Sequence, residues 1–334
     1  MKNTKRFLVI AVMVILVVAV CSTMFMSCSK DTDYTVGVCQ LVQHPALDSA
    51  TQGFVDALKE EIEAAGKTIT IDVQNASGES TNCATIVNKF VSSSYDLIMA
   101  NATPALTAAA QATKKIPVLG TSITDYATAL NIDSSAWTGT VGGNISGTSD
   151  LAPIDKQAQM VLDLIPTATK VGILYCSSEP NSLYQANKFE TEIKAKKSTI
   201  TVEKYTFSDS NDLGAVLDRI AAAGLSALYI PTDNVCASNT GIINQKATAA
   251  NLPIIAGEES IAKGCGVATL SISYYDLGKA TGKMAADILL GKANVSEMEI
   301  QYASATTYEY IASRCTALGI TVPSDYVAIE ETAA

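Results

Sequence analysis

Residues 36–60 read VGVCQLVQHPALDSATQGFVDALKE. The first five residues are a short apolar run, which predicts a buried strand. After a polar turn, apolar residues recur with the spacing of one helix face, at Leu47, Ala50, Phe54, Ala57, Leu58 and Ile62. That spacing predicts a helix over 46–65, and Gly66 follows it as a glycine commonly follows a helix. A strand, a turn and a helix make up the first half of a βαβ unit, so this segment favours a parallel sheet.

The same alternation continues along the chain and then restarts. In the first series we expect strands at 36–40, 69–73, 96–100 and 118–120, and helices at 46–65, 80–91 and 104–112. In the second series we expect helices at 154–165, 181–196, 213–223, 239–250 and 275–290, and strands at 170–176, 200–207, 227–231, 253–256 and 267–272. Two series of βαβ units predict an α/β protein with two doubly wound lobes, each built on a parallel sheet.

The lobes must be joined by crossings of the chain. Residues 141–148 are rich in glycine and have no apolar period, so we interpret them as one crossing. A second crossing near 271–274 would return the last long helix to the first lobe. The first lobe is then 35–146 plus roughly 274–300, and the second is 147–273. The pattern does not place the tail, 301–334, part of which can belong to the second lobe.

The N-terminus has the parts of an export signal. Lysines and an arginine at 2–6 precede an unbroken apolar run over 7–20, which is shorter than a membrane span of about 20 residues. We predict a lipoprotein signal peptide over 1–27, because Ser27 before Cys28 resembles a bacterial lipobox. Lipidation of Cys28 would anchor the protein outside the cytoplasm, at the cell membrane, with 28–34 as a tether. An uncleaved membrane anchor and a plain signal peptide are the alternatives.

Composition argues against several classes of function. The formal net charge is −10, and it becomes −13 without residues 1–27, which carry three positive charges and no negative one. An acidic chain with no basic cluster does not predict nucleic-acid binding. The cysteines are scattered and the chain has one histidine, so no metal site and no cofactor are expected. The pairing of the six cysteines that follow Cys28 is left open.

The motifs of common enzymes are also missing from the sequence. There is no G-x-S-x-G elbow, and the glycines at 278–283 are too closely spaced for a phosphate-binding loop and fall inside a predicted helix. We therefore expect no catalytic residues and no enzyme activity.

Polar residues follow almost every predicted strand. They stand at 43–48, 75–78, 101–104 and 121–122 in the first lobe, and at 177–181, 208–209, 232–234 and 257–258 in the second. Ligands of open parallel sheets bind beyond the carboxyl ends of the strands, so these residues predict a polar cleft between the lobes. Serine, threonine and aspartate also cap helices, but their recurrence at both lobes favours a ligand.

At this point the sequence resembles the TrpX-like ABC transporter substrate-binding proteins. The hallmark is a strand followed by Gln-x-x-x-His-Pro-Ala-Leu-Asp, which here begins at Gln40 and ends at Asp48. The likeness continues through NASGESTNCATIVNKFV, DLIMANATPALTAAAQATKKIPVLGTSITD, GGNISGTSD, SSEPNS, YIPTDN and YYDLGKATGKMAADIL. The chain departs from the pattern at three places. Gln43 stands where an acidic residue is common, Glu258 stands where aspartate is common, and the Val235-Cys236 pair is unusual.

The resemblance implies a type I periplasmic-binding-protein fold, an amino-acid ligand, often aromatic, and a permease and an ATPase as partners. It implies that the ligand lies between two sets of residues, Asn75, Ser77, Thr103, Thr121 and Ser122 on one lobe, and Ser178, Glu179, Asp233 and Glu258 on the other. His44 and Asn234 belong to the same strand ends and complete the candidate set, with His44 as a wall or hydrogen-bonding residue rather than a catalyst. We expect the protein to be a monomer.

Physical chemistry suggests a role for some of these residues. The N-terminus of the helix over 104–112, with Thr103 beside it, suits the carboxylate of an amino acid. Asp233 or Glu258 suits its ammonium group. The alternatives are a surface receptor or adhesin on the same fold, and a binding protein for another small solute such as a sugar or a purine.

Overall fold

The computed structural model describes residues 32–303 and 305–330, and from Tyr34 onward the chain forms one compact unit. The predicted signal peptide, Cys28 and most of the predicted tether lie outside the described residues. In the described part no helix is long and apolar enough to cross a membrane. The six cysteines that follow Cys28 are buried there, and none is bridged.

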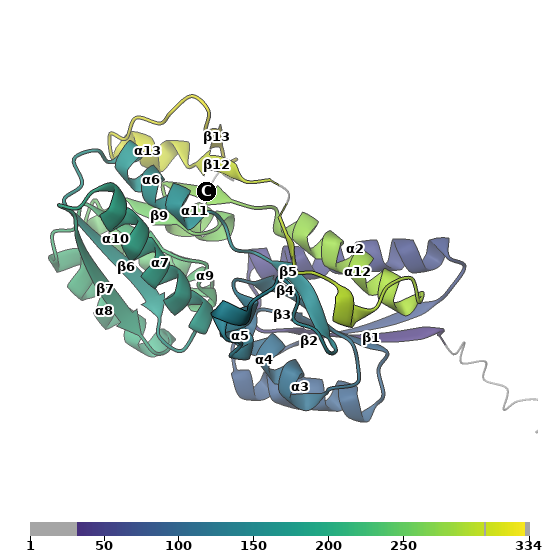
Figure 1. Ribbon diagram of the computed structural model, residues 1–334. Coiled ribbons are helices and arrows are strands. Elements are labelled where there is room, and N and C mark those ends of the chain that lie inside the picture. The colour runs from purple at the N-terminus through teal and green to yellow at the C-terminus, as the bar shows by residue number, and fades with distance from the viewer. Residues whose placement is uncertain (1–31, 304, 331–334) are drawn as a thin grey trace, which may run out of the picture. The chain divides into compact units, whose positions relative to one another are not determined.

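The first sheet has six parallel strands in the order β11-β5-β4-β3-β1-β2. The strands are β1 (Tyr34–Gln40), β2 (Ile69–Asn75), β3 (Leu97–Asn101), β4 (Val118–Ile123), β5 (Ile145–Ser149) and β11 (Gln301–Tyr302). The helices that follow them are α2 (Pro45–Ala64), α3 (Ser80–Ser92), α4 (Thr103–Ala112) and α5 (Tyr126–Leu130), with α12 (Tyr274–Leu289) added from late in the sequence (Figure 1).

Helices cover both faces of this sheet, which explains why its central strands β1 and β3 are buried and largely apolar. Val36 and Val38 of β1 pack on one side with Phe54 of α2 and Met284 of α12. Successive side chains of a strand point to opposite faces of the sheet, so Cys39 packs on the other side, with residues of α3 and α4. The short apolar run of β1 is therefore a buried central strand.

The second sheet repeats the same design. Its order is β13-β12-β10-β9-β8-β6-β7, and it is parallel except that β12 runs antiparallel to β10. The strands are β6 (Lys170–Cys176), β7 (Thr201–Phe207), β8 (Ala227–Ile230), β9 (Ile254–Ala256), β10 (Ala268–Ser271), β12 (Thr307–Tyr310) and β13 (Val327–Ala328). The helices are α6 (Ile154–Leu164), α7 (Pro180–Lys196), α8 (Ser210–Ala222), α9 (Asn234–Ser238), α10 (Thr240–Ala249), α11 (Glu259–Cys265) and α13 (Ala312–Ala317).

The helices α2 and α12 lie side by side although more than 200 residues separate them in sequence (Figure 1). Glycines make this close packing possible: a Cβ atom on Gly278 would lie 2.0 Å from the carbonyl oxygen of Ala50, and one on Gly53 would lie 2.0 Å from that of Tyr275. The last long helix thus returns to the first sheet, and the glycines at 278 and 282 serve helix contact.

The predicted α/β class with two parallel-dominated sheets is confirmed. The proposed first crossing differs in detail, because residues 145–149 form β5, which pairs with β4 in the first sheet, so the expected boundary at 146 falls inside a strand. The sequence ISGTS of β5 lacks the apolar run that marks the other strands, and its small polar residues hid it. The chain leaves the first sheet after Ser149, and β12 of the tail joins the second sheet. The division into lobes by residue range stays a proposal.

Candidate functional site

The strand order brings the polar loops together. In both sheets the first strand in sequence lies between the second and the third, which is the doubly wound order with a switch point beside the first strand. The loops that follow β1, β4 and β5 in the first sheet and β6, β8 and β9 in the second leave the carboxyl ends of their strands there. A crevice at this edge is the position in which such folds bind ligands.

A small cavity lies where these loops meet, and we call it the cleft cavity. It measures about 20 Å³, close to the space of one water molecule. The residues that line it come from both sheets and are His44, Ala46, Leu47, Ser122, Thr124, Asp150, Asn181, Thr232, Asp233, Asn234, Ala237, Glu258 and Tyr274. Five candidates from the sequence are therefore brought together, namely His44, Ser122, Asp233, Asn234 and Glu258. Sequence reasoning missed Thr124 and Asp150, which directly follow β4 and β5, and Tyr274, which begins α12 shortly after β10.

Three polar atoms of the cleft cavity have no hydrogen-bond partner in the described part of the chain. They are His44 Nδ1, Ser122 Oγ and Asn181 Oδ1, on residues that are only 7%, 6% and 6% exposed. A buried polar atom left unpaired costs about 1–3 kcal/mol. These three atoms are therefore available to hydrogen-bond with a ligand or with ordered water in the cleft cavity.

Asp150 is the carboxylate of the cleft cavity that is best suited to a charged ligand. Its side-chain partners are two hydroxyl groups, since it accepts from Thr124 Oγ1 at 3.1 Å and from the Tyr274 hydroxyl at 2.8 Å. Burial raises the pKa of Asp150, with the nearby charge of Glu258 acting in the same direction. No lysine or arginine lines the cavity. An ammonium group would therefore find an uncompensated carboxylate here.

Asp233 and Glu258 reach the cavity but are occupied by backbone groups. Asp233 accepts from the backbone N–H of Cys176 at 2.6 Å and of Cys236 at 2.8 Å, and it caps α9. Glu258 accepts from the N–H of Ile261 at 2.7 Å and of Ser260 at 2.6 Å, and it caps α11. Helix capping, which the sequence offered as the alternative, therefore describes what these two carboxylates do in the structure.

Glu179 does not line the cavity, but it holds residues that do. Its carboxylate accepts from the N–H and the side-chain amide of Asn234, at 3.1 and 2.8 Å, and from the amide of Asn181 at 3.1 Å. Burial, followed by the negative charge of Asp233, raises the pKa of Glu179 to about 7. In the described part of the chain, no lysine or arginine forms an ion pair with either carboxyl group, so the negative charge of Asp233 acts on Glu179 without a cation to offset it.

The remaining candidates lie elsewhere. Asn75 and Ser77 are exposed and bond to each other through the Ser77 N–H, at 2.7 Å. Thr103 is buried at the start of α4, and the hydroxyl of Thr121 contacts that of Thr148 at 3.2 Å inside the first sheet. Ser178 donates to the carbonyl of Ser208 at 3.0 Å. The structure does not place these five residues in the lining of the cleft cavity.

Strained backbone marks the same edge of the first sheet. Ala102 and Ser122 are not glycine but have a positive φ. Ala102, directly after β3, has φ of +88°, and Ser122, within a bulge of β4, has φ of +55°. Left-handed backbone in such residues costs about 1–3 kcal/mol and collects at ligand sites. At Ser122 it belongs to a residue whose hydroxyl lines the cleft cavity.

Hydrogen bonds join the two sheets around the cleft cavity. His44 Nε2 lies 3.2 Å from Asn234 Oδ1. Thr124 Oγ1 accepts from the Gln185 side-chain amide at 3.2 Å and lies 3.5 Å from the Thr232 hydroxyl. These contacts connect loops of the first sheet with loops of the second and close the cavity from two sides.

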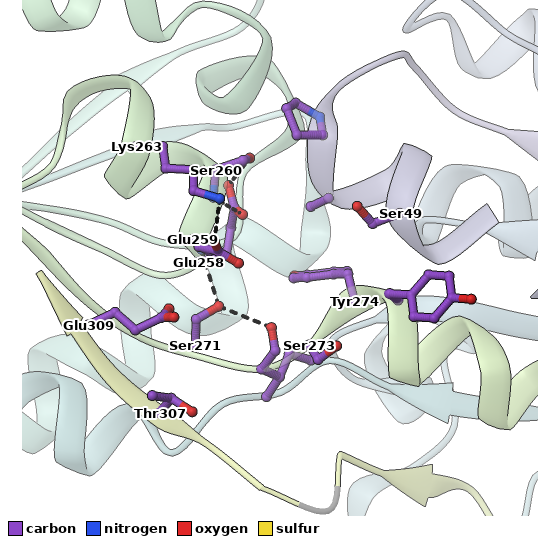
Figure 2. Close-up of a pocket in the computed structure, with 14 residues that line it drawn as sticks. Ser49, Glu258, Glu259, Ser260, Lys263, Ser271, Ser273, Tyr274, Thr307 and Glu309 are labelled. Carbon is purple, nitrogen blue, oxygen red and sulfur yellow. Dashed lines mark hydrogen bonds and ion pairs between the residues drawn. The ribbon is translucent and has the colours of Figure 1, made fainter. Parts of the chain in front are cut away.

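A larger cavity of about 240 Å³ lies beside the first, and we call it the hinge cavity. It is bounded by Ser49 at the start of α2, by α11 and by the chain segment 271–275. Figure 2 shows Glu258, Glu259 and Lys263 on one side of this space and Ser49 on the other. Lys263 pairs with Glu259 at 2.5 Å. Burial, then the charge of Glu259, raises the pKa of Glu309 to about 7. Ala46, Glu258 and Tyr274 line both cavities.

No group of three or more histidine, cysteine, aspartate or glutamate side chains within 32–303 and 305–330 is arranged to hold a metal ion. The cleft cavity offers hydrogen bonding and negative charge, and the hinge cavity adds the Lys263–Glu259 ion pair.

Comparison with known proteins identifies the family of this chain. Residues 35–330 match the family model of ABC transporter substrate-binding proteins. The chain is 38% identical over 258 residues to a tyrosine-binding protein of Clostridioides difficile (strain R20291), with 77% of this chain and 73% of that protein covered. The fold and the cleft define a two-lobed solute-binding protein. The chain belongs to the ABC transporter substrate-binding protein family.

Two solved structures are similar over nearly the whole chain. One is an ABC domain from Streptococcus pneumonia in complex with L-Trp, with a TM-score of 0.80 and 31% identity, covering 87% of this chain and 96% of that one. The other is a ligand-free, open substrate-binding protein with adhesive properties from Clostridium difficile, with a TM-score of 0.67 and 33% identity, covering 90% and 100%. At nearly equal identity, the present structure is closer to the ligand complex, as its nearly filled cleft cavity would require.

The family consists of binding proteins that work outside the cytoplasm, take up small-molecule ligands and act with ABC permeases, and it is not a family of enzymes. The predicted family, the type I periplasmic-binding-protein fold and the substrate-binding role are thereby confirmed.

Proposed function

We propose that this protein binds a free aromatic amino acid between its two lobes and delivers it to an ABC permease, while a lipid on Cys28 holds it at the membrane. The observation that carries the ligand class is the cleft cavity, where Asp150 and three unpaired polar atoms surround a space without a basic side chain. The ammonium group of an amino acid supplies one positive charge and three N–H donors, which match this lining.

The hinge cavity supports the aromatic part of the proposal. At about 240 Å³ the hinge cavity is large enough for an amino-acid side chain, and the cleft cavity is not. Tyr274 and Ala46 line both cavities. Pro45, Ile272 and the two tyrosines at 274 and 275 give it apolar and aromatic surface. The relatives named for tyrosine and solved with L-Trp point to the same ligand class.

Titration calorimetry tests the ligand class. L-Tyrosine, L-tryptophan and L-phenylalanine are titrated into protein that comprises residues 29–334, with N-acetyl-L-tyrosine, L-rhamnose and adenosine as controls. We expect at least one free aromatic amino acid to bind in the micromolar range or tighter, and the N-acetylated form to bind at least a hundredfold more weakly. Binding of the sugar or the nucleoside instead would reject the proposal in favour of another solute.

The lipid anchor has its own test. In the Cys28→Ala variant, the mature protein should move from the membrane fraction to the soluble fraction after fractionation of the producing cells. Retention of the cleaved variant at the membrane would contradict lipidation at this position.

One relative suggests an additional role at the surface, because its structure is described as that of a substrate-binding protein with adhesive properties. Adhesion and transport are separable by experiment. A strain without this gene should lose uptake of the radiolabelled amino acid if the protein transports, and should lose only attachment to host cells if it is an adhesin.

A further inference from the structure

The hydrogen bonds around Glu179 determine how the side-chain amides of Asn234 and Asn181 are oriented. At pH 8, above its pKa of about 7, Glu179 is ionised and only accepts hydrogen bonds, so the end of the Asn234 side chain that faces Glu179 Oε2, at 2.8 Å, must be its NH2 group. The carbonyl oxygen of the same amide then points the other way, to His44 Nε2 at 3.2 Å. Amide orientation and histidine tautomer are thereby assigned from the hydrogen-bond network.

The tautomer of His44 follows from the orientation of Asn234. A carbonyl oxygen only accepts, so Nε2 of His44 must carry the hydrogen, and the neutral ring then has a bare Nδ1. This Nδ1 is the unpaired atom of the buried ring in the cleft cavity. His44 therefore offers the ligand an acceptor and not a donor.

Asn181 is oriented by the same carboxylate. Its NH2 group donates to Glu179 Oε2 at 3.1 Å and to the carbonyl of Thr232 at 3.1 Å. Its Oδ1 is left as the unpaired atom, which is again an acceptor in the cleft cavity. With Asp150, the cavity thus holds three acceptors on three different loops.

On the basis of the proposed function, we infer that Glu179 is a positioning residue that selects ligands with a primary ammonium group: by orienting Asn234 and Asn181, it gives the cleft cavity a set of acceptors at His44 Nδ1, Asn181 Oδ1 and Asp150. An ammonium group has three N–H donors and no acceptor, so it satisfies all three sites at once. A hydroxyl or a neutral amide has fewer donors and leaves at least one acceptor unpaired.

The tautomer of His44 can be observed directly, because it is the only histidine in the chain. Protein is produced with ¹⁵N-labelled histidine and purified without a histidine tag, and its imidazole nitrogens are recorded by NMR with saturating L-tyrosine and with L-tryptophan. We expect the neutral ring with hydrogen on Nε2 and a bare, hydrogen-bonded Nδ1. The opposite tautomer, or a doubly protonated ring, in the complex would overturn the inference.

A variant tests whether Glu179 controls this polarity. In Glu179→Gln, an amide with one acceptor oxygen and one NH2 group replaces two acceptor oxygens. In the wild type each oxygen accepts a backbone N–H, from Asn234 at 3.1 Å and from Val235 at 3.3 Å. The neighbouring amides lose their charged partner, and His44 should show a mixture of tautomers. The matched control is Asp209→Asn, which makes the same chemical change at the exposed cap of α8, away from both cavities.

The decisive quantity is a ratio of affinities. L-Tyrosine is compared with 3-(4-hydroxyphenyl)propionate, which lacks only the ammonium group. We expect Glu179→Gln to reduce the preference for L-tyrosine by about tenfold, or about 1.4 kcal/mol, and Asp209→Asn to leave it unchanged. Equal weakening of both ligands would show that Glu179 only supports the fold, and would overturn the inference.

The outcomes separate this inference from the proposed function. If wild-type protein binds none of the aromatic amino acids, the proposed function fails, and with it the basis of the inference. If it binds L-tyrosine but keeps the same ratio in Glu179→Gln, the function stands and the inference fails.

Discussion

At the scale of single residues, the structure separates carboxylates that cap or hold helices from one whose side-chain partners are hydroxyl groups. Asp233, Glu258 and Glu179 are buried carboxylates with backbone N–H donors, and those bonds hold the short helices α9 and α11 in place. Asp150 accepts from the hydroxyl groups of Thr124 and Tyr274. We expected the ammonium partner at Asp233 or Glu258, and the proposed function places it at Asp150.

The first prediction concerns Asp150. Asp150→Asn should weaken binding of the aromatic amino acid by about 30-fold or more, since loss of a buried, charge-assisted partner costs about 2–5 kcal/mol. The unfolding temperature of the ligand-free variant should change little, because Thr124 and Tyr274 can still bond to the amide. Calorimetry and thermal unfolding measure the two effects. Undiminished affinity in the variant would remove Asp150 from the site.

The second prediction concerns pH. The pKa of Glu179 is raised to about 7, and burial also raises the pKa of Asp150 and of Asp233. His44 and Glu258 are ionisable residues that also line the cleft cavity. The folded state then binds more protons than the unfolded state above pH 4.5 or so, so stability falls as the pH rises towards 7. The ligand-free protein should unfold at a higher temperature at pH 5.5 than at pH 8.

Ligand binding should show the opposite dependence on pH, because an ammonium group needs ionised carboxylates. The rise in unfolding temperature that saturating L-tyrosine causes should be larger at pH 8 than at pH 5.5. Differential scanning fluorimetry at both values, with and without the ligand, measures both slopes. Slopes of the same sign would contradict the assignment of buried carboxylates to the ligand.

At the scale of secondary-structure elements, the contact between α2 and α12 holds the last helix against the first sheet. The glycines of the two helices let their backbones approach until side chains would collide with carbonyl oxygens. A glycine inside a helix normally lowers its stability by about 0.5–1 kcal/mol, so its presence here requires a gain from close packing.

The third prediction tests that contact. Gly278→Ala should destabilise the protein by about 1–3 kcal/mol, since its Cβ would lie 2.0 Å from the Ala50 carbonyl oxygen. Gly241→Ala in α10 is the matched control: no heavy atom lies within 4 Å of its added Cβ, so helix propensity alone should raise stability by up to about 1 kcal/mol. Urea denaturation measures both, and effects of equal sign would refute the packing argument.

At the scale of the whole molecule, the cleft cavity is formed by loops of two sheets that each have their own core. Contacts such as that between His44 and Asn234 are made by loops and can break without disturbing either core. The TM-score is 0.80 with the tryptophan complex and 0.67 with the open, ligand-free relative, at nearly equal identity. Opening must precede ligand entry, because about 20 Å³ admits no amino acid.

The fourth prediction concerns this closure. Small-angle X-ray scattering should show a smaller radius of gyration on addition of L-tyrosine, because ligand binding shifts the lobes towards the closed form. Asp150→Asn at the same ligand concentration provides the control and should show no compaction. An identical profile for wild-type protein with and without bound ligand would exclude a closing cleft.

The sequence alone determined the alternation of strands and helices, the two parallel sheets and the edge at which polar loops collect. It could do so because strand and helix periods are local properties, and because parallel strands deliver all their carboxyl ends to one edge. The family resemblance followed from contiguous segments such as 36–60. The strand β5 was missed because ISGTS is small and polar, and its burial comes from its neighbours.

Only the tertiary structure decided which polar residues line the cleft cavity. Asp150 and Asp233 both follow strands, and their local sequences do not tell a helix cap from a free carboxylate. The difference arises from partners far away in the chain, as when Tyr274 bonds to Asp150 across 124 residues and Asn234 to His44 across 190. Hydrogen-bond polarity is set by such distant contacts, and no local pattern in the sequence records it.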